Sequence, residues 1–105
     1  MSINVEKVSS DMLSAIKGSV GNQWGSVKDV ATQFLQNDKE RLLLIAEMRL
    51  KEKLTDAEFR SQIDDEKLMM EAELNAVEVL SKAVAQKAAN AALDVLQKAV
   101  LAAIV

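Results

Sequence analysis

The sequence predicts an all-α protein: a helical hairpin with a long C-terminal helix and a short N-terminal helix, assembled as an oligomeric helical bundle. Three observations predict this fold. The 105 residues include no proline, and the three glycines all lie between residues 18 and 25. Apolar residues recur three and four positions apart, which is the period of one helix face. The segment from Leu54 to Phe59 carries the start signal of a helix.

At this length we expect one domain, a single helical unit over residues 1–105. The first predicted helix covers residues 4–17, and Asn4 is a suitable N-cap. Its apolar face consists of residues at helical spacing: Val5, Val8, Met12, Ile16 and Val20. A glycine-rich hinge over residues 18–25 follows, because glycines and small polar residues cluster there.

A second helix is predicted over residues 26–53. Ser26 and Asp29 have the spacing of a capping box, in which each side chain satisfies an unpaired backbone N–H. The polar stretch 36–41 contains no strong helix breaker, so we expect one uninterrupted helix.

The start of the third helix has the clearest signal. Thr55 and Glu58 form a capping box, and Leu54 and Phe59 occupy the two positions of a hydrophobic staple. The short connection makes the second and third helices antiparallel neighbours. From Asp56 onward no glycine, proline or turn cluster occurs, so one helix over residues 56–104 is predicted.

The third helix carries a candidate interface for a second copy of the chain. At 1.5 Å per residue it spans roughly 70 Å against roughly 40 Å for the second helix, so about 30 Å remains uncovered. A two-fold homodimer is a common way to cover such a surface. We expect Val84→Asp to dissociate or unfold the assembly at a cost of several kcal/mol. Apolar and small residues alternating four and three apart define the predicted interface: Met70, Leu74, Val77, Val84, Ala88, Ala91 and Val95.

Several chemistries are excluded by composition. The chain has no cysteine and no histidine, which removes the usual zinc sites, iron–sulfur clusters, thiol nucleophiles and serine–histidine–acid triads. The acidic run 64–66 does not converge on one ion, because consecutive helical residues point about 100° apart. We therefore expect no enzymatic activity, no cofactor and no metal ion.

The charge balance and the chain termini bear on partners and location. A net charge of −3 argues against nucleic-acid binding, which needs clustered basic residues. The N-terminus lacks the pattern of a signal peptide, so a cytoplasmic location is expected. Lys87, Asp94 and Lys98 interrupt the apolar C-terminal region, so no transmembrane segment is predicted.

The predicted function is a non-enzymatic, homo-oligomeric scaffold or adaptor. Its expected partner is a second copy, with another protein as the alternative. Trp24 is either an anchor that buries the hinge or a partner contact. Two other readings remain: a carrier of an apolar small ligand, which needs a cavity beside Ala88 and Ala91, and a protein that associates with a membrane surface.

Overall fold

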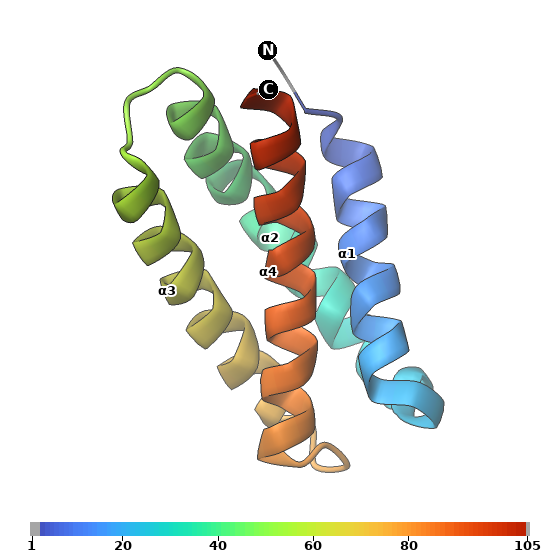
Figure 1. The fold of residues 1–105 in the computed structure, drawn as a ribbon. Coiled ribbons are helices and arrows are strands. Elements are labelled where there is room, and N and C mark those ends of the chain that lie inside the picture. The colour runs from blue at the N-terminus through green and yellow to red at the C-terminus, as the bar shows by residue number, and fades with distance from the viewer. Residues whose placement is uncertain (1–2, 105) are drawn as a thin grey trace.

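The protein is all-helical. The computed structural model describes residues 3–104, and these form four α-helices and one short 3-10 helix, with no strand (Figure 1). The predicted all-α fold class is therefore confirmed. The molecule measures 40 × 23 × 21 Å. In chain order the elements are α1 (Val5–Val20), η1 (Gly21–Gln23), α2 (Trp24–Leu50), α3 (Asp56–Asn75) and α4 (Lys82–Ile104).

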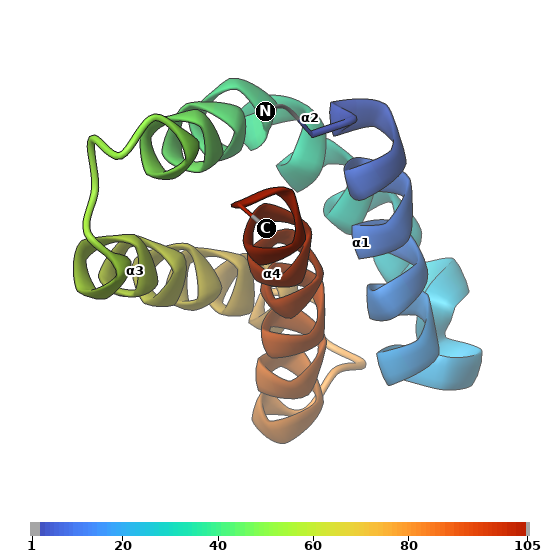
Figure 2. The same ribbon diagram turned by 45° about the horizontal axis from the view of Figure 1, so that its top comes forward.

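α4 is the central helix of the bundle. Figure 2 shows α4 between α1 and α3, and it contacts α1, α2 and α3. Its buried face is made of alanines followed by larger apolar residues, and alanines allow neighbouring helices to approach closely. The buried residues of α4 are Ala85, Ala88, Ala89, Ala92, Leu93, Leu96 and Val100.

α1 begins as predicted and ends later than predicted. The Asn4 side chain accepts a hydrogen bond from the Lys7 backbone N–H at 3.1 Å, which confirms the N-cap. The helix continues through Gly18 to Val20, three residues beyond the expected end. The chain then turns at Gly21, whose φ of +60° favours a residue without a Cβ. The hinge is therefore a single sharp turn.

α2 is one uninterrupted helix across the polar stretch 36–41, as predicted, but both of its ends differ from the prediction. It begins at Trp24, so Ser26 lies inside the first turn and the predicted capping box of Ser26 and Asp29 is wrong. The short turn at Gly21 leads directly into the helix and leaves Ser26 no N-cap position. α2 ends at Leu50, and a loop over 51–55 leads to α3.

The start of α3 confirms the strongest local prediction. The Glu58 N–H donates to the Thr55 hydroxyl at 3.1 Å, and the Thr55 N–H donates to the Glu58 carboxylate at 2.8 Å. Leu54 and Phe59 are both buried, as a hydrophobic staple requires.

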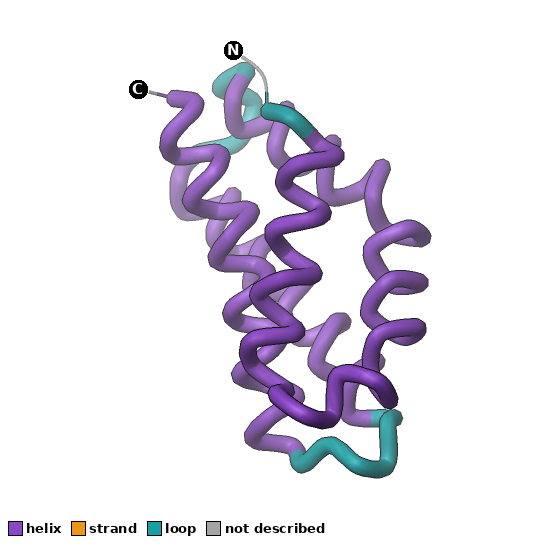
Figure 3. The backbone as a smooth tube through the Cα atoms, turned by 90° about the vertical axis from the view of Figure 1, so that its right-hand side faces the viewer, coloured by secondary structure: helices purple, strands orange, loops and turns teal. Residues whose placement is uncertain are grey.

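The prediction of one helix over residues 56–104 is wrong, because the helix is interrupted between Asn75 and Lys82 (Figure 3). Ser81 caps the new helix, since its hydroxyl accepts the Val84 N–H at 3.2 Å. Leu80 is buried in the core and fixes the turn. The break lets α4 fold back into the bundle, so part of the surface that was expected to need a second copy packs within one chain.

Candidate functional site

A groove between α2 and α3 is one of the larger concave features of residues 3–104, and we call it the α2–α3 groove. It is open to solvent and has a volume of about 640 Å³. Pockets that bind ligands commonly fall between about 300 and 1,000 Å³. α2 supplies six lining residues and α3 supplies three: Asp29, Val30, Gln33, Phe34, Asn37 and Asp38, then Met69, Ala72 and Glu73.

The floor of the α2–α3 groove is apolar. Phe34 is buried at its base and Val30 is half-buried. On the α3 side, Met69 is 44% exposed and Ala72 is also exposed. A flexible, polarizable methionine in such a position adapts to different partner surfaces.

The rim of the same groove is acidic. Asp29 and Asp38 stand on the α2 wall and Glu73 on the α3 wall, and none of the lining residues is a cation. Neither Asp29 nor Glu73 forms an ion pair within residues 3–104. The apolar floor is therefore bordered by an unpaired carboxylate on each wall.

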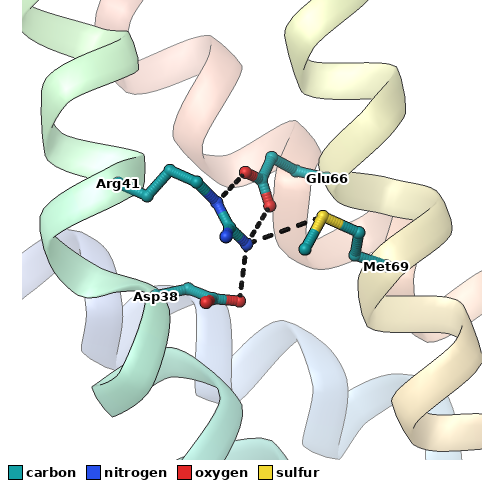
Figure 4. A network of polar contacts seen from close by, with 4 residues as sticks. All are labelled: Asp38, Arg41, Glu66 and Met69. Atoms are coloured by element: carbon teal, nitrogen blue, oxygen red, sulfur yellow. Dashed lines mark hydrogen bonds and ion pairs between the residues drawn. The ribbon is translucent and has the colours of Figure 1, made fainter.

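An ion-pair network closes one end of the groove (Figure 4). Arg41 on α2 binds Glu66 on α3 through two bonds, Nε to Oε1 at 2.5 Å and Nη2 to Oε2 at 3.0 Å. The same Nη2 lies 3.0 Å from Asp38 Oδ2 and 3.6 Å from Met69 Sδ. Arg41 thus joins the two helices and holds two groove residues in place.

The electrostatics of this network favour a permanently charged Arg41. Its pKa is raised, chiefly by the hydrogen bond to Glu66. Glu66 is only 3% exposed, so its carboxylate depends on that guanidinium for compensation. Because Asp38 also contacts Arg41, the positive charge is opposed by two carboxylates.

A second groove of nearly equal size runs between α1 and α4. This α1–α4 groove has a volume of about 630 Å³, and many of its lining residues are small, including Ala99 and Ala102. Its charges are mixed: Lys7, Lys98 and Asp11 all line it, and Lys7 pairs with Asp11 at 3.1 Å.

The structure separates the residues predicted as an oligomer interface. Three are buried inside one chain: Met70, Leu74 and Ala88. Four are half-buried: Val77, Val84, Ala91 and Val95. The break between α3 and α4 divides the set, so these residues do not form one continuous stripe. Their contact with a second copy stays a prediction.

Trp24 is the first residue of α2 and is half-buried. It packs against the hydrophobic core, which favours the anchor over the partner contact.

The Arg41–Glu66 pair was missed at the sequence level, although one signal for it exists. Glu66 lies three residues after Ile63 and four before Met70, so it occupies a core position of an apolar helix face. A charged residue in such a position indicates a buried ionic partner. Its identity is not local information, because Arg41 lies 25 residues away.

The sequence matches no protein-family model, and no curated protein and no solved structure is significantly similar to it. Within residues 3–104, no cluster of acidic side chains is arranged to hold a metal ion. No helix in the same range combines the length and the apolar character needed to cross a membrane.

Proposed function

We propose that this protein is a non-enzymatic helical adaptor that receives a helix of another protein in the α2–α3 groove. The supporting observation is an apolar floor that remains open to solvent between two well-formed helices. The α2 wall from Asp29 to Asp38 is about 14 Å long, enough for about two and a half turns of a docked helix. Helices that dock in such grooves bury an apolar face.

Further exposed apolar residues lie on the same two helices. Leu44 on α2 is 55% exposed and Leu68 on α3 is 65% exposed. Leu44 lies seven residues after Asn37, which lines the groove, and so lies close to the same stripe of α2. Leu44 extends the apolar area that a partner would cover along α2, whereas Leu68 lies about 100° away from Met69 around α3.

A second copy of the chain is the second candidate occupant, which retains the predicted homo-oligomeric scaffold. The exposed Leu44, Leu68 and Met69 favour it. The predicted helix lengths do not favour a second copy, because α4 covers the hairpin within one chain. The carrier function has less support, since Ala88 is buried and neither Ala88 nor Ala91 lines any groove described above.

The test is site-specific photo-crosslinking in cells that express the chain naturally. A photoreactive residue replaces Ala72 in the groove, and the matched control replaces Asn90, which is exposed on α4. We expect a discrete protein adduct at position 72, absent at position 90 and lost when Met69→Glu is added. An adduct of twice the chain mass would identify the occupant as a second copy. Equal or no labelling at positions 72 and 90 would contradict the proposal.

A further inference from the structure

We infer that the α2–α3 groove selects an amphipathic helix whose apolar face is flanked by lysine or arginine. This inference rests on the proposed function and adds the chemical class of the partner. It depends on the signs of the charges around the groove, whereas the proposed function depends on its apolar floor.

The rim presents negative charge without internal compensation. Asp29 and Glu73 are exposed, and neither has an ion-pair partner within the described part of the chain. Arg41 contacts the groove residues Asp38 and Met69, and its charge is already opposed by Asp38 and Glu66. A basic partner therefore meets attraction from both walls and little repulsion from the closed end.

The floor and the rim together fit the shape of basic side chains. Lysine and arginine bury their aliphatic stems on apolar surface while their charged ends reach a polar rim. Met69 and Ala72 supply exposed apolar surface on the α3 side, next to Glu73. Gln33 and Asn37, joined by a 3.1 Å hydrogen bond, add polar groups on the α2 side. An acidic helix would gain the floor contacts but meet like charge on both walls.

The experiment uses the full chain and three labelled peptides of about 20 residues, above the roughly 12–15 residues at which isolated helices are marginal. The peptides share one apolar face and carry flanking Lys, Gln or Glu. Fluorescence anisotropy measures each Kd. We expect the Lys peptide to bind about tenfold more tightly than the Glu peptide, with the Gln peptide between them. The preference should shrink as salt rises from about 50 mM to about 500 mM.

Two double variants distinguish the effect of the rim charges on peptide affinity from the effect of the net charge of the protein. Asp29→Lys with Glu73→Lys should reverse the order of the peptides. Asp64→Lys with Glu47→Lys changes net charge equally at exposed positions outside the groove, and it should leave the order unchanged. Circular dichroism checks that both variants remain folded.

The outcomes test the basic-helix inference and the proposed function separately. Equal affinity for all three peptides, or an equal response to both double variants, would overturn the basic-helix inference and leave the docking groove in place. Failure of every peptide to bind would overturn the proposed function itself.

Discussion

The two grooves of this protein have nearly the same volume but different chemistry. The α1–α4 groove, about 630 Å³, has an apolar lining of Ile3, Val8, Val95 and three alanines, together with charges of both signs. The α2–α3 groove, about 640 Å³, has Phe34 and Met69 in its floor and only acidic residues among its charged lining. Size alone therefore does not identify a docking surface. The exposed Met69 and the uncompensated charge of Asp29 and Glu73 favour the α2–α3 groove.

The helix pairs also differ in what holds them together. α4 packs in the centre of the bundle through the buried alanines Ala85, Ala88 and Ala89. α2 and α3 are joined beside their groove by the Arg41–Glu66 ion pair. The close packing of the buried alanines leaves no space for a larger side chain. The Arg41–Glu66 ion pair, in contrast, joins α2 and α3 at one end of their groove, and the remainder of that groove is open to solvent. The following predictions test this difference, in order of decreasing effect.

The largest loss of folding stability is expected from a substitution at the centre of the bundle. Ala88→Asp places an unpaired carboxylate in the core and should lower the free energy of unfolding by about 5 kcal/mol. Val84→Asp should cost only about 1 kcal/mol, because Val84 is half-buried in the first turn of α4, where negative charge is favoured. Urea unfolding followed by circular dichroism measures both values. Equal losses would support the continuous seam that the structure does not show.

The next effect concerns the bridge between α2 and α3. Arg41→Ala removes the partner of the buried Glu66 carboxylate and should cost about 3 kcal/mol. Arg60→Ala is the matched control, because Arg60 pairs with Asp56 on the surface, and its loss should cost below about 0.5 kcal/mol. Chemical denaturation compares the two variants. A cost for Arg41→Ala no larger than the control would show that the bridge does not hold the helices together.

A smaller effect is expected at the start of α3. Thr55→Ala removes the N-cap hydrogen bond and should cost about 1 kcal/mol. Ser26→Ala should be nearly neutral, because Ser26 does not cap α2. The difference between the two melting temperatures checks both statements. Similar losses at the two sites would indicate that α2 begins at residue 27 after all.

The smallest effect is a pH dependence from the same capping box. The pKa of Glu58 is held below its ordinary value by hydrogen bonds with the backbone and the side chain of Thr55. A lowered pKa in the folded state contributes stability above the unfolded value and loses it as the pH falls through the folded value. Glu58→Gln should therefore flatten the decrease in urea midpoint below about pH 4.5. An unchanged pH profile would contradict the role of this carboxylate.

The sequence predicts those parts of the fold that depend on neighbouring residues. The start of α3 is specified within six consecutive residues, from Leu54 to Phe59, so their pattern alone predicts it. The break at residues 76–81 was missed because it contains no glycine or proline, and the apolar spacing continues across it. What determines the break is the burial of α4 against three other helices, which is a property of the whole chain.

The candidate site was predictable only in its composition. The acidic run 64–66 was visible in the sequence, but the α2–α3 groove depends on Asp29 and Glu73, which lie outside that run on two different helices. It also needs Arg41 to meet Glu66 across 25 residues. Such pairings depend on how far the two helices separate, and helix periodicity does not contain that distance.

The most direct test of the account compares the two grooves in one experiment. Amide NMR spectra of the labelled chain are recorded during titration with the Lys-flanked peptide. We expect shift changes concentrated at residues 29–38 and 69–73, with the residues of the α1–α4 groove unchanged. Changes centred on residues 95–103, or spread evenly over all helices, would contradict the assignment of the α2–α3 groove as the docking surface.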